Sequence, residues 1–145
     1  MENGVLAALF DQTVTIYHPT FVPQFSCRRQ VLTGVSYQWS RTSSLGTLGK
    51  SRTGRALMGE SLGGEGCLRI YCRGRTFQSW EDPAGENTFS LALGDKILPG
   101  EGPEILTRDQ WDALVPALAE GVTAVRRITP YQLGSRLILV EGKGE

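Results

Sequence analysis

The stretch Thr13-Val14-Thr15-Ile16-Tyr17 decides the fold class, because β-branched and aromatic residues alternate there with a period of two. This composition and period are typical of a strand that lays one face on a hydrophobic core. The same alternation returns in Val35-Ser36-Tyr37-Gln38-Trp39 and in Leu68-Arg69-Ile70-Tyr71. Together these stretches predict a mainly β protein.

Further strands are expected along the chain, with turn residues between them. Residues 28–39 predict either two strands or one long strand bent at Gly34. The remaining strands are expected at residues 89–93, 97–98, 122–128 and 136–140. About six strands, without alternating β-α-β units, favour a small antiparallel β-barrel or sandwich.

One short helix is expected near residues 107–119. Thr107 and Gln110 have the spacing of a capping box, in which each side chain satisfies a backbone N–H group at the start of a helix. Apolar side chains follow at helical intervals, namely Trp111, Leu114, Val115 and Leu118. Pro116 is expected to stop or kink this helix.

Length and composition limit the possible architectures. The chain has 145 residues, of which 40% are hydrophobic, so residues 1–145 are expected to form a single domain with one core. With 18 glycines and 7 prolines, the chain is too rich in turns for a helix bundle. No apolar stretch approaches the roughly 18 residues of a membrane span, and the first residues lack the basic flank of a signal peptide. We therefore expect a soluble, intracellular protein without a membrane partner.

Residues 41–66 form the longest stretch without strand or helix periodicity, and they include seven glycines. A loop of this length inside a compact domain is usually functional or mobile. Cations gather in it and shortly after it, at Lys50, Arg52, Arg55, Arg73 and Arg75. Flexible cations can hold a phosphate backbone without reading bases, which makes these residues candidates for a functional site. The alternative is an ordinary solvated surface.

The formal net charge is zero, but the charges are unevenly distributed. Residues 1–80 carry a net charge of +5, and residues 81–145 carry −5. Patches of opposite sign could join copies of the chain head to tail, as in heterologous rings. The alternative is a folded surface that interleaves the two halves, since halves of a sequence need not be halves in space.

One segment approaches a nucleotide-binding motif. Residues 44–51, Ser-Leu-Gly-Thr-Leu-Gly-Lys-Ser, have serine where a phosphate-binding loop requires its first glycine. The segment also lacks the preceding buried strand and the following helix that would direct backbone N–H groups at a phosphate. We therefore expect a loop without a nucleotide cofactor.

The cysteines and the single histidine form no recognisable metal or catalytic motif. Cys67 and Cys72 lie five positions apart in an expected strand, so they point to opposite faces, and Cys27 and His18 are distant in sequence. We expect buried thiols rather than a zinc site. No spacing pairs His18 with a nucleophile and an orienting acid. No catalytic, metal or cofactor residue is therefore predicted.

Six short motifs follow one another in a fixed order over nearly the whole chain. They are Thr13-Val14-Thr15-Ile16-Tyr17, Gly34-Val35 before a strand ending at Trp39, Leu68-Arg69-Ile70-Tyr71, Gly94-Asp95-Lys96-Ile97, Val122-Thr123-Ala124-Val125, and Gly134-Ser135 before the last strand. This order resembles a group of small proteins from the head and neck gene modules of long-tailed bacteriophages.

The resemblance implies a head–tail connector component, most plausibly the stopper or head-completion protein. It implies a small β-barrel whose copies form a ring between the adaptor ring beneath the portal and a tail-side protein. It also implies loops that narrow the DNA channel, non-specific contact with packaged DNA, a place in the virion after synthesis in the bacterial cytoplasm, and no enzymatic activity. Residues 41–66 and the five cations are then expected to face the channel or a neighbouring subunit.

Three other functions make different demands. A tail-completion or tail-terminator protein would use the oppositely charged halves for ring contacts and would bind the tail tube. A stand-alone nucleic-acid-binding barrel would expose aromatic side chains such as Tyr37 and Trp39, although their alternation suits a buried face better. A hydrolase would require a pocket containing His18 and an aligned carboxylate.

Overall fold

The computed structural model describes residues 10–41, 64–114 and 121–145. These residues form eight strands and one helix. The strands are β1 (Gln12–Thr20), β2 (Ser26–Arg41), β3 (Gly64–Tyr71), β4 (Thr76–Phe77), β5 (Thr88–Phe89), β6 (Lys96–Pro99), β7 (Thr123–Leu133) and β8 (Arg136–Gly144). The helix is α4 (Arg108–Ala113). The predicted mainly β fold with one short helix is confirmed.

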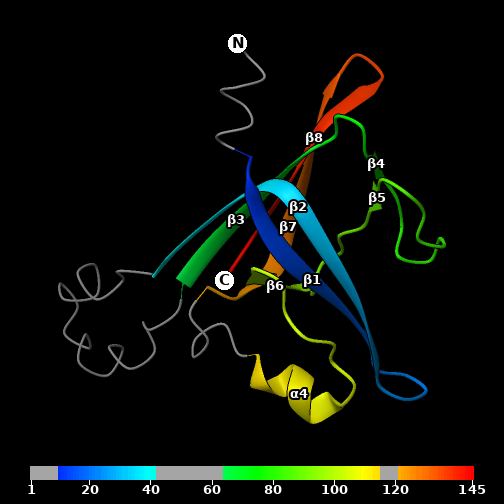
Figure 1. Ribbon diagram of the computed structural model, residues 1–145, viewed down its shortest axis with the longest axis vertical. Coiled ribbons are helices and arrows are strands. Elements are labelled where there is room, and N and C mark those ends of the chain that lie inside the picture. Colours follow the sequence, from blue (N-terminus) through cyan, green and yellow to red (C-terminus); the bar gives the residue numbers. More distant parts are fainter. Residues whose placement is uncertain (1–9, 42–63, 115–120) are drawn as a thin grey trace.

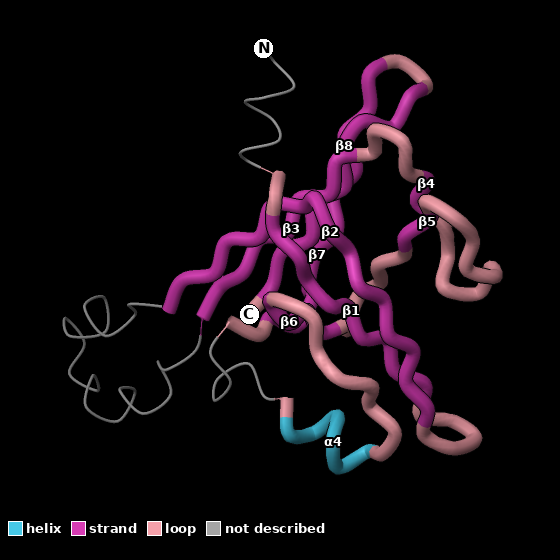
Figure 2. The backbone as a smooth tube through the Cα atoms, viewed as in Figure 1, coloured by secondary structure: helices cyan, strands magenta, loops and turns pink. Residues whose placement is uncertain are grey.

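Six of the strands form a closed antiparallel barrel in the order β1-β2-β3-β8-β7-β6, with β6 returning to β1 (Figures 1 and 2). Because each of these strands has a neighbour on both sides, the sheet closes on itself. The two remaining strands, β4 and β5, pair in parallel beside the barrel. The sequence motifs thus predicted the architecture that the chain adopts.

Residues 28–39 belong to one long strand rather than two. The first part of β2 pairs with β1 as far as Val35, and the second part pairs with β3 from Ser36 onward. Gly34 lies at this change of partner with a φ of +68°, a conformation that side chains disfavour. The expected bend at Gly34 therefore allows a single strand to serve both sides of the barrel.

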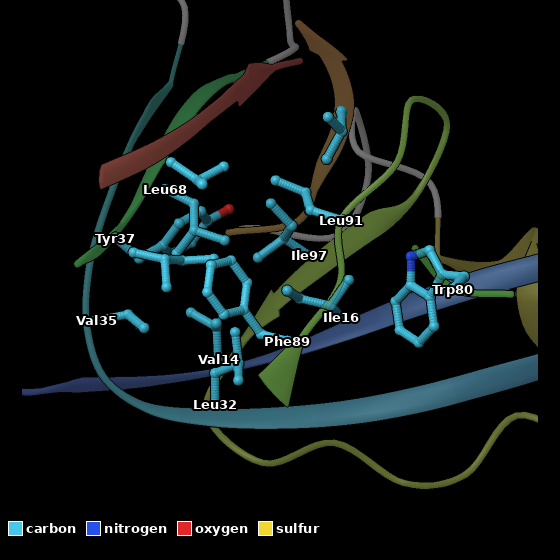
Figure 3. Packing of buried hydrophobic residues seen from close by; sticks show 13 residues of the cluster. Val14, Ile16, Leu32, Val35, Tyr37, Leu68, Trp80, Phe89, Leu91 and Ile97 are labelled. Carbon is cyan, nitrogen blue, oxygen red and sulfur yellow. The ribbon is translucent and has the colours of Figure 1, made fainter. Parts of the chain in front are cut away.

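The period-two alternation places the main hydrophobic core inside the barrel. Val14 and Ile16 of β1 pack there together with side chains from β2, β3, β6, β7 and β8 (Figure 3). The segment around β4 and β5 adds Trp80, Phe89 and Leu91 to the same cluster. The barrel core is therefore completed by residues that lie outside the six barrel strands.

The prediction of a strand over residues 89–93 is wrong, because only Thr88–Phe89 is extended and paired. Side chains replace the strand ladder after this point. The Gln30 amide donates to the Ser90 carbonyl at 3.0 Å and accepts from the Ser90 N–H at 3.1 Å. The Asp95 carboxylate accepts from the Ala92 N–H at 2.9 Å. These bonds hold the segment without a neighbouring strand.

The last two strands form a longer hairpin than the sequence predicts. The sequence predicts strands over residues 122–128 and 136–140, but β7 continues to Leu133, and only Gly134 and Ser135 separate it from β8. Thr129 pairs with Glu141, and the pairing persists as far as Leu133 and Arg136. The proline at position 130 is accommodated within this pairing, so it does not end the strand.

The capping box at the helix start is confirmed. The Thr107 hydroxyl accepts from the Gln110 N–H at 3.2 Å, and the Gln110 side chain accepts from the Thr107 N–H at 3.1 Å. The helix ends at Ala113, earlier than the expected residue 119, and residues 115–120 lie outside the described residues. Trp111 joins a second hydrophobic cluster with Tyr17 on the outer side of β1.

The predicted loop over residues 41–66 is shorter at both ends than expected. Arg41 ends β2, and residues 64–66 begin β3 by pairing with residues 39–41. Residues 42–63 lie outside the described residues, as does the apolar run before Phe10. The strands therefore define where this segment leaves and rejoins the barrel.

Candidate functional site

The structure describes two of the five predicted cations, Arg73 and Arg75. Lys50, Arg52 and Arg55 lie outside the described residues. The segment that contains them rejoins the barrel at the beginning of β3, whereas Arg73 and Arg75 follow the other end of that strand. The role of these five cations at a channel or subunit contact stays a prediction.

Arg75 has a structural role in the barrel. Its guanidinium donates to the carbonyl oxygens of Thr33 and Gly34, at the point where β2 changes partner. Burial lowers the pKa of Arg75 from its ordinary value. Arg75 therefore braces the bend of β2, and much of its charge is directed at backbone rather than at solvent.

A groove of about 620 Å³ lies at the end of the barrel where β2 ends and β3 begins. Residues of β2, β3, β7 and β8 line it together with the C-terminal Glu145. Its cations are Arg69, Arg126, Arg127 and Lys143. The groove also contains the carboxylates of Glu65 and Glu145 and the side chain of Trp39. We call this hollow the basic groove.

Strand register brings these cations together from distant parts of the sequence. Cys67 of β3 pairs with Lys143 of β8, which pairs with Arg127 of β7. In the next row, Arg69 pairs with Glu141. Because Leu68 and its alternating neighbours are buried in the core, these residues share the outer face of the sheet. No local sequence pattern marks this cluster, since its members are far apart in the chain.

Glu141 lies beside the basic groove and contacts two of the cations that line it. Its side chain is only 7% exposed, yet Arg69 Nε donates to it at 2.9 Å and Lys143 Nζ lies 3.7 Å away. The Tyr131 hydroxyl donates at 3.2 Å, and the Cys67 thiol lies 3.5 Å from the second carboxylate oxygen. Burial opposes ionisation, but these bonds and charges prevail and hold the pKa of Glu141 below its usual range.

Arg126 and Arg127 supply the positive charge that Glu141 does not compensate. Both side chains are exposed at the beginning of β7. Within residues 10–41, 64–114 and 121–145, no carboxylate forms a salt bridge with either of them. Arg69 and Lys143 lie beside Glu141, so the groove combines two cations that contact this carboxylate with two that can reach a ligand.

The three cysteines are protonated thiols and only half-buried. Burial raises the pKa of Cys27 to about 11, and it also raises the pKa of Cys67 and of Cys72. The Glu141 charge raises the pKa of Cys67 further. A thiol must ionise to attack a substrate or bind a metal, so none of the three is activated for either role. In the described part of the chain, no three His, Cys, Asp or Glu side chains are grouped to hold a metal ion.

His18 does have a carboxylate partner, which the sequence spacing did not reveal. Its Nδ1 lies 2.6 Å from Asp95 Oδ1, and Trp80 Nε1 donates to Asp95 Oδ2 at 2.8 Å. The imidazole stacks on the Trp80 ring with centroids 4.8 Å apart. The Arg28 guanidinium lies over the same indole and donates to the Trp80 carbonyl. The histidine is thus packed into a structural cluster, and it is not among the residues that line the basic groove.

Tyr37 is unavailable for stacking on a nucleic-acid base. The residue is buried, and its hydroxyl lies 2.5 Å from the Gly121 carbonyl oxygen and 2.6 Å from Thr123 Oγ1. Burial raises the pKa of Tyr37 to about 12. Trp39 is half-buried and packs against the barrel core beside Gly64. The expectation that both belong to a buried face is confirmed for Tyr37.

Exposed apolar side chains gather at the tips of two hairpins. Phe21 and Val22 form the β1–β2 tip, where Val22 is 81% exposed. Tyr131 and Leu133 form the β7–β8 tip, where Leu133 is 76% exposed. The two hairpins project from the barrel in opposite directions (Figure 1). Apolar groups that project in this way are typical of protein contact surfaces.

Comparison with models of known protein families, with curated proteins and with solved structures gives no match to this chain. Among the described residues, no helix has the length and apolar character needed to cross a lipid bilayer. The functional argument therefore rests on the surfaces described above.

Proposed function

We propose that this chain is a structural component of the head–tail connector of a long-tailed bacteriophage, in the position of the stopper or head-completion protein. Copies of the barrel would form a ring that closes or gates the DNA channel. The ring would contact an adaptor or portal-side neck protein on one side and a tail-side protein on the other. In this proposal the chain works by fitting against other proteins, and it catalyses no reaction.

The observation that carries this proposal is the small closed barrel with an exposed apolar tip at each of two oppositely directed hairpins. A ring subunit between two other rings needs contact surfaces that point in both axial directions as well as sideways. The β1–β2 tip and the β7–β8 tip supply the first kind of surface. The order of the sequence motifs adds the resemblance to phage neck proteins.

The distribution of charge supports a sideways contact, although the opposite charges do not follow the two halves of the sequence. The two halves of the chain interleave, because β3 of the first half pairs with β8 of the second. Exposed carboxylates instead gather in the loop between β4 and β5, at Glu81, Asp82 and Glu86. Exposed cations lie at the beginning of β7, at Arg126 and Arg127.

Deletion of the coding sequence from the genetic element that carries it tests the proposal. We expect tailless heads that have lost their DNA, with tailed particles restored by supplying the chain in trans. Electron microscopy of the particles and nuclease sensitivity of their DNA are the measurements. Normal tailed particles after deletion would contradict the proposal. Heads that stay full, beside tails of abnormal length, would instead indicate the tail-completion or tail-terminator role.

A further inference from the structure

We propose that the basic groove binds the acidic loop between β4 and β5 of a second copy of this chain. The acidic loop is residues 78–87. This inference rests on the proposed ring function, because it names the sideways contact between neighbouring subunits. The contact joins a hollow in which cations outnumber carboxylates to a projecting segment that carries only negative charge.

The charge of the acidic loop is of one sign. Glu81, Asp82 and Glu86 are exposed, and the sequence has no lysine or arginine from position 76 to position 95. The loop projects from one side of the barrel, whereas β3 begins on the other side (Figure 1). The basic groove lies at the beginning of β3. One copy can therefore present the loop to one neighbour and the groove to another.

Internal hydrogen bonds give the acidic loop a defined shape. The Thr88 hydroxyl bonds to both the N–H and the carbonyl of Gly85, at 3.0 and 2.9 Å. The Gln78 amide donates to the Pro83 carbonyl at 3.0 Å, and the Ser79 hydroxyl accepts from the Glu81 N–H at 3.1 Å. A preorganised loop loses less conformational entropy on binding than a flexible one.

The base of the acidic loop is attached firmly to its own barrel. Trp80 is buried, donates to Asp95 at 2.8 Å, and accepts from Arg28 through its carbonyl. The Phe77 and Phe89 rings stack with centroids 5.2 Å apart on either side of the loop. The three carboxylates are therefore carried on a rigid projection rather than on a free strand of chain.

The composition of the basic groove suits an acidic peptide better than a nucleic acid. Arg126 and Arg127 can pair with carboxylates of the loop. Glu65 and Glu145 also line the groove and would repel a phosphate backbone, whereas a peptide can offer them backbone N–H donors. A volume of about 620 Å³ is in the range of hollows that enclose a ligand.

A contact of this kind uses two different surfaces and is therefore heterologous. Each copy contributes its groove to one contact and its loop to the next, so the interaction propagates from copy to copy and gives a ring when the rotation between neighbours closes. Closure requires no further surface for the sideways contact. The two apolar tips then stay available for the proteins above and below the ring.

Charge reversal provides the test. The loop variant carries Glu81→Lys, Asp82→Lys and Glu86→Lys, and the groove variant carries Arg126→Glu and Arg127→Glu. Sedimentation velocity over a range of protein concentrations should show self-association of the unmodified chain that weakens as salt is raised. Each variant alone should associate at least about tenfold more weakly, since like charges then face one another. An equimolar mixture of the two variants should recover association, because each altered surface meets its complement.

Matched controls separate this contact from a general effect of net charge. Glu101→Lys, Glu104→Lys and Asp109→Lys change the charge as much as the loop variant does, and Arg108→Glu with Arg136→Glu matches the groove variant. Both controls should associate like the unmodified chain. All substituted residues are exposed, so circular dichroism and thermal unfolding should confirm that every variant folds.

Three results would overturn the inference. They are a monomer at every concentration, variants that associate as strongly as the unmodified chain, and a groove variant that associates normally but no longer binds a DNA duplex. The last result would identify the groove as a phosphate site. Rings that survive both reversals would refute this contact and leave the connector proposal standing, whereas intact tailed particles after gene deletion would refute the connector proposal itself.

Discussion

Asp95 and Glu141 are both carboxylates that the barrel removes almost completely from solvent, yet their pKa values shift in opposite directions. Burial raises the pKa of Asp95, and the hydrogen bonds from His18, Ala92 and Trp80 do not reverse this. Burial also opposes ionisation of Glu141, but Arg69 and the neighbouring donors reverse it, so that its pKa is lowered. The number of strong cations nearby decides the outcome.

The difference indicates two kinds of role. Asp95 accepts two neutral donors, which fix the Trp80 indole and the segment before β6, so it completes the barrel core. Glu141 lies on the outer face, where it contacts Arg69 and Lys143, two of the cations that line the groove. One carboxylate therefore maintains the fold, and the other arranges a surface. Three substitutions test this contrast.

The largest effect on stability is expected for Asp95→Ala. Without an acceptor, the Trp80 Nε1–H and the Ala92 N–H lose their partner inside the protein, which should lower the free energy of unfolding by about 2–4 kcal/mol. Asp95→Asn keeps an oxygen for both donors and should cost less than about 1 kcal/mol. Urea denaturation followed by tryptophan fluorescence measures both. Equal losses for the two variants would mean that the charge of Asp95, rather than its bonds, matters.

A smaller and pH-dependent effect is expected for Glu141→Gln. A carboxyl group whose folded pKa lies below its unfolded value of about 4.3 adds stability above that pH and loses it as the pH falls through the folded pKa. Glu141→Gln should therefore lower the free energy of unfolding at pH 7 by about 1–3 kcal/mol and have little effect near pH 2. Denaturation curves at several pH values check this, with exposed Glu65→Gln as control. A difference that stays constant with pH would argue against a charged role.

The smallest effect is expected for Lys143→Met. Its ammonium group is half-exposed and lies 3.7 Å from Glu141, and such surface pairs contribute little, so stability should change by less than about 0.5 kcal/mol. The same denaturation experiment at low and high salt measures it. A larger loss would show that Lys143 stabilises the Glu141 carboxylate as much as Arg69 does. Two cations rather than one would then distinguish Glu141 from Asp95.

The sequence predicted a mainly β fold, a barrel or a sandwich, because the relevant signal is local. Val14 and Ile16 on one strand, like Leu68 and Ile70 on another, have a period that does not depend on the partner strand. The segment after Phe89 was mispredicted because its hydrogen bonds come from Gln30, some sixty residues earlier in the chain, and no local pattern records that partnership.

The candidate site was less predictable for a related reason. The cations predicted as a site from the sequence lie close together in the chain, such as Lys50 and Arg52. The basic groove instead joins Arg69 to Arg127 through the register of three strands, and register depends on bulges and turn lengths that composition does not fix. The Asp95 partnership with His18 was missed for the same reason, since seventy-seven residues separate the two.

The path of β2 has a mechanical consequence. A single strand leads from the β1–β2 tip to the margin of the basic groove, where Gln38 and Trp39 line the hollow. Along this path the backbone is hydrogen-bonded first to β1 and then to β3, and the change of partner occurs next to Gly34. Tension applied at one end of β2 is thus carried by the covalent backbone to the other end, through the bend at Gly34.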